Sequence, residues 1–192
     1  MEFTIQQSDL SYALSTALAS VPAKSTLPIL SAVLLEAEKD HLRITGTDLD
    51  VTTTITVPCS VKSPGRAAVQ ARHFADAVRK LPKDQVKVSE DAQGRISIEY
   101  GKGKGRSAVP RQNDQEFPAL PTVKADAKAT IEGPALARLI ARSAYAVSSD
   151  ETRPMLNGVF VQAEAKQVSF VATDGHRLAR ATRTGDFGGL GK

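Results

Sequence analysis

Residues 25–38 of this chain read STLPILSAVLLEAE, and residues 151–164 read ETRPMLNGVFVQAE. The two stretches align without a gap at an offset of 126 residues. Identical residues occupy six of the fourteen positions: Thr26 and Thr152, Pro28 and Pro154, Leu30 and Leu156, Val33 and Val159, Ala37 and Ala163, and Glu38 and Glu164. The same offset places Thr47-Asp48 on Thr173-Asp174. Because repeats decide architecture, we expect one complete module, residues 1–126, and about half of a second, residues 127–192.

The bulk composition is that of an ordinary globular protein. Of the 192 residues, 41% are hydrophobic and 24% are charged, which excludes a disordered chain. No run approaches the roughly 18 apolar residues of a membrane span. The first residues, MEFTIQQ, lack the basic and apolar segments of a secretory signal. The single cysteine, Cys59, has no internal disulfide partner. These features predict a cytoplasmic protein with no membrane partner.

The net charge of +4 is spread unevenly along the chain. Residues 1–64 carry 4 basic and 7 acidic side chains, residues 65–126 carry 12 and 8, and residues 127–192 carry 9 and 6. A basic surplus in the last two segments suits contact with a polyanion, although many globular proteins share it.

The pattern of apolar residues predicts three successive β-α-β-β-β units of about 63 residues each. The first unit is expected to have a strand at Phe3 and Ile5, a helix capped by Ser8, and strands at 30–38, 41–45 and 51–57. The second is expected at 67–70, 71–81 (helix), 86–90, 96–100 and 106–109, and the third at 130–131, 134–147 (helix), 158–163, 168–172 and 178–182. This order indicates a sheet-rich α+β fold.

Three segments between these elements have simple interpretations. The glycine- and lysine-rich run 101–106 (GKGKGR) does not precede a helix, so a hairpin tip is favoured over a phosphate loop. Pro110 cannot donate to a strand ladder, which predicts that the strand before it lies at a sheet edge. Residues 112–126 contain two prolines and read as an extended interdomain linker.

The predicted helices carry basic residues away from their apolar faces. At about 100° per residue, Arg72, Arg79 and Lys80 share one face of the second helix. Arg138 and Arg142 lie one turn apart on the third, opposite a predicted buried stripe formed by Leu136, Leu139, Ile140 and Val147. No aromatic residues interleave with the basic ones, and no cluster suited to reading base edges occurs. A DNA contact through these faces would therefore be made to phosphates, independently of base sequence.

The repeated stretches also resemble a known family. The residues that carry the resemblance are Thr26 to Leu30 (TLPIL), Thr45 to Leu49 (TGTDL), Phe117-Pro118 and Val171 to Ala179 (VATDGHRLA). Their order and spacing are similar to those of the bacterial β sliding clamp, the processivity subunit of DNA polymerase III. The resemblance runs from residue 1 to about residue 184.

The resemblance implies the DNA-clamp fold. In that family each subunit has three similar domains, and two subunits close head to tail into a ring. Antiparallel sheets lie outside, and helices line a central channel around duplex DNA. This chain would supply domain one (1–126) and the first half of domain two (127–192), without the third domain. The implied protein is a non-catalytic, cofactor-free factor that tethers the replicative polymerase for processive synthesis.

The resemblance also assigns roles to individual residues. Contacts to double-stranded DNA fall to Lys24, Arg72, Arg79, Lys80, Arg138, Arg142 and Arg153. One wall of the groove that accepts a short hydrophobic peptide of polymerases, clamp loader and repair proteins falls to Leu156, Thr173, Gly175, His176, Arg177 and Leu178. The edge strand that pairs with the partner subunit of the homodimer includes Ser107 and Val109.

Two other functions remain as alternatives. Asp48, Asp50, Asp174 and His176 are residue types found in metal-dependent phosphoesterases, although their spacing fits no familiar metal site. Because Asp48 and Asp174 occupy equivalent repeat positions, a turn in which aspartate accepts backbone N–H bonds explains them better. A generic basic nucleic-acid-binding domain is the second alternative.

Overall fold

The computed structural model describes residues 1–119 and 129–187. The chain divides into two compact units, Met1–Pro121 (unit 1) and Thr122–Lys192 (unit 2). Unit 1 contains helices α1 (Gln7–Ala17) and α2 (Ala71–Arg79), and strands β1 (Glu2–Gln6), β2 (Ala32–Glu38), β3 (His41–Thr47), β4 (Thr52–Pro58), β5 (Ser60–Ser63), β6 (Gly65–Gln70), β7 (Gln85–Glu90), β8 (Arg95–Tyr100) and β9 (Gly105–Gln112). Short 3-10 turns lie at Leu18–Ser20, Pro28–Ser31 and Asp114–Glu116.

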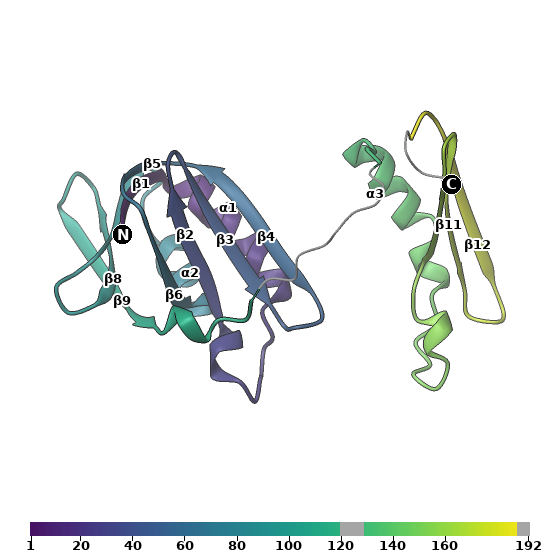
Figure 1. Ribbon diagram of the computed structural model, residues 1–192, viewed down its shortest axis with the longest axis horizontal. Coiled ribbons are helices and arrows are strands. Elements are labelled where there is room, and N and C mark those ends of the chain that lie inside the picture. The colour runs from purple at the N-terminus through teal and green to yellow at the C-terminus, as the bar shows by residue number, and fades with distance from the viewer. Residues whose placement is uncertain (120–128, 188–192) are drawn as a thin grey trace. The chain divides into compact units, whose positions relative to one another are not determined.

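The nine strands described in unit 1 form one antiparallel sheet in the order β4-β3-β2-β6-β9-β8-β7-β1-β5 (Figure 1). This order shows that the two β-α-β-β-β units exchange their first strands. β1 pairs with β7 of the second unit, where Phe3 faces Val88. β6 pairs with β2 of the first unit, where Val69 faces Val33. Each half of unit 1 is therefore completed by a strand from the other half.

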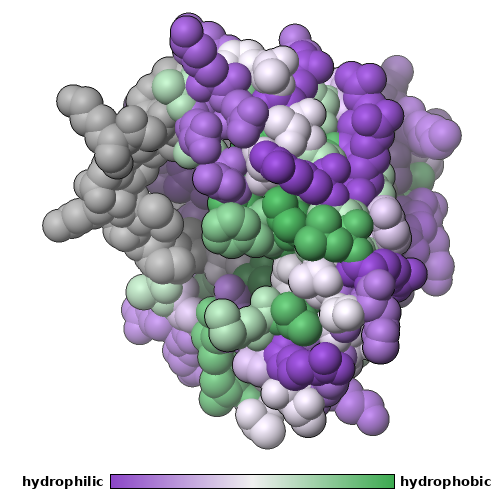
Figure 2. Space-filling model, turned by 90° about the vertical axis from the view of Figure 1, so that its right-hand side faces the viewer, coloured by the Kyte–Doolittle hydropathy of each residue, from purple (hydrophilic) through white to green (hydrophobic). Residues whose placement is uncertain are grey.

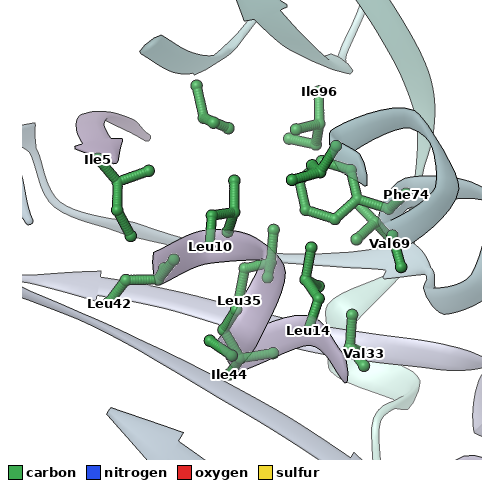
Figure 3. Close-up of a cluster of buried hydrophobic side chains, with 14 of the residues drawn as sticks. Ile5, Leu10, Leu14, Val33, Leu35, Leu42, Ile44, Val69, Phe74 and Ile96 are labelled. Carbon is green, nitrogen blue, oxygen red and sulfur yellow. The ribbon is translucent and has the colours of Figure 1, made fainter. Parts of the chain in front are cut away.

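The apolar core of unit 1 lies between the sheet and the two helices. α1 contacts α2, β3 and β4, and α2 contacts β2 and β6. Side chains from both helices and from several strands point toward one another, as Leu14, Leu35 and Phe74 do in Figure 3. All three are fully buried. Burial of such side chains stabilises each by roughly 1.5–3 kcal/mol relative to exposure, which holds the helices on the sheet.

The predicted N-cap of the first helix is wrong. α1 begins at Gln7, directly after β1, and no side chain caps its N-terminus. The backbone N–H of Gln7 instead donates to the carbonyl of Asp84 at 3.0 Å. The Gln7 Nε2 donates to the carbonyl of Val78 at 2.9 Å. Ser8 lies inside the helix and donates only to Asp9, because tertiary partners satisfy the helix start.

The end of unit 1 differs in part from the expectation. The predicted hairpin tip is confirmed, since residues 101–104 form the turn between β8 and β9. β9 pairs with β8 from Gly105 to Pro110 but with β6 only at Arg111 and Gln112, which confirms an edge before the proline. The linker prediction is wrong over residues 112–117: this segment packs on unit 1, and Phe117 is 4% exposed. Residues 120–126 of that prediction lie outside the described residues. The prediction also missed β5, a short strand that pairs with β1.

Unit 2 contains helix α3 (Gly133–Ala141), the 3-10 turns Ala144–Ala146 and Pro154–Leu156, and strands β10 (Phe160–Glu164), β11 (Gln167–Thr173) and β12 (Leu178–Thr184). The described strands form an antiparallel sheet in the order β10-β11-β12. β11 and β12 begin and end 126 residues after β3 and β4, and α3 begins 126 residues after α1. The repeat found in the sequence is thus also a repeat of secondary-structure elements, at the same offset of 126 residues.

Two elements predicted for unit 2 are wrong. Residues 130–131 form no strand. In unit 1 the equivalent strand, β1, lies between β5 and β7 and pairs with both. The predicted helix 134–147 ends at Ala141, because the Ser143 hydroxyl donates to the carbonyls of Leu139 and Ile140 and the backbone tightens. Ile140 is 45% exposed and does not belong to the buried stripe.

Unit 2 exposes apolar residues whose counterparts in unit 1 are buried. Phe160 and Val161 of β10 are 66% and 50% exposed, whereas Leu34 and Leu35, 126 residues earlier in β2, are 2% and 0% exposed. β2 is flanked by β6, but β10 has a neighbour on one side only among residues 129–187. Figure 2 shows hydrophobic surface surrounded by hydrophilic side chains on the face that it views.

No helix in the described parts of the chain is long and apolar enough to cross a membrane.

Candidate peptide-binding turn and basic helix faces

A rigid turn joins β11 to β12 in unit 2. The Oδ1 atom of Asp174 accepts the backbone N–H groups of His176 and Arg177, both at 2.9 Å. The Thr173 hydroxyl donates to the carbonyl of Arg177 at 2.7 Å and accepts the N–H of Gly175 at 3.1 Å. Gly175 has a φ of 93°, a conformation that favours glycine. This bonding confirms the predicted role of Asp174 as a turn residue.

The side chains that follow Asp174 are accessible to solvent. His176, Arg177 and Leu178 are exposed, and Leu178 is 67% exposed although it begins a strand. Exposure of a large apolar side chain next to fixed polar groups is typical of a binding surface.

Arg177 is held from two sides. Its Nε donates to Asp174 Oδ2 at 2.8 Å, and its guanidinium carbon lies 5.7 Å from the centroid of the Tyr145 ring, within reach of a cation–π contact. The backbone N–H groups of Arg177 and His176 lower the pKa of Asp174 from 3.8 to about 2, with a smaller contribution from the Arg177 charge. Asp174 therefore stays ionised and keeps the turn closed at neutral pH.

A second loop lies against this turn. Arg153 donates through Nε to Asp150 Oδ2 at 2.8 Å. The hydroxyl of Thr152 and the guanidinium of Arg153 lower the pKa of Asp150. Arg153 Nη1 lies only 3.4 Å from the point that a Cβ atom on Gly175 would occupy. The family resemblance assigned Arg153 to DNA contacts. The structure places it beside the turn of the predicted peptide wall. Leu156, in the same loop, is half-buried.

The basic residues of α2 lie on its exposed face. Arg72, Arg79 and Lys80 are exposed, while Phe74 and Val78 face the core with 0% exposure. Arg79 Nη1 lies 3.3 Å from Asp76 Oδ1, an exposed pair that contributes little to stability. The helical periodicity in the sequence therefore places these three cations correctly on one solvent-facing side.

In unit 2, Arg138 on α3 and Arg142, the residue directly after α3, are exposed. Together with Arg183 of β12 they line a pocket of about 160 Å³. Sequence reasoning missed Arg183, because only the packing of α3 on β12 brings this residue, some 40 positions later in the chain, next to the helix. Arg183 also lies 3.5 Å from Glu132.

The other sequence-predicted residues lie apart from these clusters within unit 1. Lys24 is exposed in the loop that follows α1. Ser107 is half-buried and Val109 is 8% exposed, because the Val109 side chain belongs to the core of unit 1. Among the described residues, β9 thus has an unpaired backbone edge from Gly105 to Pro110, which includes Ser107, while the Val109 side chain supports the fold.

The residues of the metal alternative serve as turn residues. Asp48 Oδ1 accepts the backbone N–H groups of Asp50 and Val51, as Asp174 does for His176 and Arg177. Across residues 1–119 and 129–187, no group of three or more His, Cys, Asp or Glu residues is arranged to hold a metal ion.

Comparisons with known proteins identify the family of both units. Residues 1–121 match the family described as DNA polymerase III beta subunit, N-terminal domain, and residues 130–185 match its central domain. The chain is 32% identical over 187 residues to the beta sliding clamp of Bacillus subtilis, covering 93% of this chain and 49% of that protein. It thus spans about half the length of the curated relatives it matches.

Two solved structures are similar over almost the whole chain. The DNA polymerase III subunit beta from Pseudomonas aeruginosa aligns with a TM-score of 0.90 and 30% identity, covering 99% of this chain and 51% of that one. The pol III beta of Caulobacter crescentus aligns with a TM-score of 0.87 and 33% identity, covering 98% and 52%. The chain has the clamp fold, and it belongs to the family of bacterial DNA polymerase III beta subunits, the beta sliding clamps.

Proposed function

We propose that this chain forms the first one and a half domains of a subunit whose ring encircles duplex DNA and tethers the replicative polymerase. Domain one comprises residues 1–126, and residues 127–192 begin domain two. The matches to the N-terminal and central domain families, in this order along the chain, carry the proposal. Retention by topology requires no catalytic group, so the subunit acts as a processivity factor in the cytoplasm and needs no cofactor.

The exposed cations on α2 and α3 are proposed to face the DNA backbone. Arg72 and Arg79 on α2 and Arg138 on α3 occupy solvent-facing positions, as do Lys80 and Arg142, which directly follow these helices. No Asn or Gln suited to reading base edges accompanies these long side chains. They therefore contact DNA phosphates with similar energy whatever the base sequence. A sequence-independent contact of this kind lets a ring slide. Lys24 and Arg153 are proposed as additional loop contacts.

The turn between β11 and β12 is proposed to form one wall of a peptide groove. Leu178 supplies an apolar contact, and His176 and Arg177 supply polar groups whose positions are fixed by Asp174. The wall also includes Leu156, Thr173 and Gly175. An extended peptide places apolar anchors against such a surface while polar groups set its orientation. Polymerase, clamp loader and repair proteins are the proposed sources of the peptide.

The open edge of β9 is proposed to pair with a strand of the partner subunit in a head-to-tail homodimer. From Gly105 to Pro110 the strand has one neighbour among the described residues, β8, so its outer N–H and C=O groups are free to pair. Ser107 lies within this edge.

The experiment that tests the proposal uses a subunit of the relatives' full length that begins with these 192 residues. A clamp loader places it on a nicked DNA circle, the circle is washed in high salt, and the DNA is then cut once. A topological ring survives the salt and leaves only after the cut. Protein that leaves with salt alone, regardless of the cut, is an electrostatic binder, and the ring proposal fails.

A second measurement separates the peptide role from the ring. In the same full-length subunit, His176→Ala with Leu178→Ala should weaken binding of a polymerase-derived peptide at least tenfold. The loader, which is proposed to use the same wall, should load fewer rings, but the fraction of loaded rings that survives the salt wash should stay unchanged. A charge-neutral surface change on the same sheet, Thr182→Ser, is the matched control. Unchanged peptide affinity in the double variant would remove the proposed role of this turn.

A further inference from the structure

The turn of unit 2 has a structural twin in unit 1, between β3 and β4. Residues Thr47 to Val51 lie 126 positions before Thr173 to Arg177. Thr47 Oγ1 donates to the carbonyl of Val51 (3.1 Å) and accepts the N–H of Leu49 (3.1 Å), as Thr173 does at 2.7 and 3.1 Å. The N–H of Asp48 donates to the carbonyl of Val51 at 3.2 Å, and the equivalent distance in unit 2 is 3.4 Å.

The aspartates of the two turns play the same part in the backbone. Asp48 Oδ1 accepts the N–H groups of Asp50 and Val51 at 3.1 and 2.7 Å, where the bonds to Asp174 Oδ1 are both 2.9 Å. All five hydrogen bonds of the turn are therefore conserved between the two units. What differs is the set of side chains that this shared backbone presents.

Unit 1 places large apolar side chains on the turn. Leu49 has a φ of 84°, and the equivalent Gly175 has a φ of 93°. A leucine in this region strains the backbone, and burial does not offset the strain, because the Leu49 side chain is 57% exposed. Val51, where unit 2 has Arg177, is 56% exposed. The hydrogen bonds that the two turns share impose this φ in both units, and the leucine adds exposed apolar surface that packing within unit 1 does not cover.

The aspartate of the unit 1 turn also lacks the ion pair that its counterpart in unit 2 makes. In unit 2 the second oxygen of Asp174 accepts Arg177 Nε at 2.8 Å. In unit 1 valine replaces that arginine. Within residues 1–119 of unit 1, neither Asp48 Oδ2 nor the carboxylate of Asp50 accepts a hydrogen bond or forms an ion pair. The turn thus presents two unpaired carboxylates beside two apolar side chains, at one end of the sheet (Figure 1).

We propose that residues 47–51 form a second docking surface, specific for an extended protein segment that carries an arginine between large apolar residues. The incoming guanidinium takes the place at Asp48 that Arg177 fills in unit 2, because a planar fork matches a carboxylate. The apolar neighbours of that arginine contact Leu49 and Val51. This inference goes beyond the proposed function. It concerns a turn of unit 1, and its partner is a positively charged protein segment rather than the negatively charged DNA.

The test is an amide NMR titration of the 192-residue protein with blocked pentapeptides. ALRLA is the probe, ALELA reverses its charge, and ASRSA removes its apolar residues. We expect ALRLA to shift the amides of Leu49, Asp50 and Val51 in a saturable way up to about 5 mM, a range that detects millimolar affinity. An exposed ion pair predicts roughly three- to fivefold tighter binding of ALRLA than of ALELA.

Three variants test the mechanism without disrupting the turn. Asp48→Asn keeps the oxygen that accepts both N–H groups but removes the charge, so ALRLA should bind only as weakly as ALELA. Val51→Arg restores the internal ion pair seen in unit 2 and should have the same effect. Leu49→Gly, the residue found in the equivalent position, should leave the turn folded and weaken binding to the level of ASRSA.

The inference is overturned by three results: no shifts at residues 47–51, equal affinity for ALRLA and ALELA, or unchanged affinity in the Asp48→Asn variant. The same spectra report residues 173–178 separately. A response at 173–178 alone would overturn this inference and leave the proposed peptide wall intact, whereas a response at 47–51 alone would support the inference without supporting that wall.

Discussion

Leu35 and Val161 occupy the same place in the repeat, one in β2 and one in β10, yet only Leu35 is covered. Leu35 is 0% exposed and faces Ala67 of β6, whereas Val161 is 50% exposed. Leu35→Ala leaves a cavity inside a closed core, which costs about 2–5 kcal/mol of the free energy of unfolding of unit 1. Val161→Ala removes side-chain surface that is already half in water, so we expect a loss below about 1 kcal/mol in unit 2.

Urea unfolding monitored by the amide signals of each unit measures both effects. With a slope of roughly 2 kcal/mol per molar urea, Leu35→Ala should lower the midpoint of unit 1 by about 1–2.5 M. Val161→Ala should lower the midpoint of unit 2 by less than about 0.5 M. Equal shifts in the two variants would refute the reasoning, because burial of β2 by the exchanged strand would then have no energetic consequence.

Three further predictions concern charge, pH and packing. Charge reversal at Arg79 and Arg142 in a full-length subunit should lower retention on circular DNA at moderate salt, with circular dichroism unchanged; retention equal to that of the unaltered protein would contradict the assignment of these faces. The depressed pKa of Asp174 means that its contribution to stability is complete above pH about 4 and is lost as the pH falls towards 2; a side-chain carbon NMR titration should give a midpoint near 2 rather than near 3.8. Gly46→Ala would place a Cβ against the carbonyl oxygen of Ala17, closer than van der Waals contact allows, so thermal unfolding should show a loss of about 1–3 kcal/mol or more; a Gly133→Ala control, which meets nothing within 4 Å, should show none.

The sequence allowed good prediction of features that depend on local pattern. The 126-residue offset places β11 and β12 at their observed bounds relative to β3 and β4. The periodicity of α2 correctly separates Arg72 and Arg79 from the buried Phe74 and Val78. The equivalence of Asp48 and Asp174 indicated a hydrogen-bonded turn, which both residues form. Each of these features follows from the spacing of residues within one element, or from the repetition of that spacing 126 residues later.

The failures have non-local causes. Ser8 is a residue type that often caps helices, but the backbone N–H of Gln7, at the start of α1, donates to the carbonyl of Asp84, 77 positions later. Arg153 could not be placed beside Gly175 from the sequence, because loop packing determines that proximity. The positive φ of Leu49 and the exposure of its side chain could not be predicted either, because the residues TGTDL are compatible with an ordinary turn.

The exchange of first strands between the halves of unit 1 has a consequence for synthesis on the ribosome. β1 pairs with β7 in a register that runs from Glu2–Ser89 to Gln6–Gln85, so its partner is made some 80 residues later. At roughly 5–20 residues per second, the nascent N-terminal strand waits about 4–16 s before that partner exists. During this interval the β7 side of β1 has no partner strand, although β5, made some 60 residues after β1, is available for the other side. An apolar strand edge left open in this way can pair with other chains. Unit 1 therefore cannot complete its core until β7 has been made.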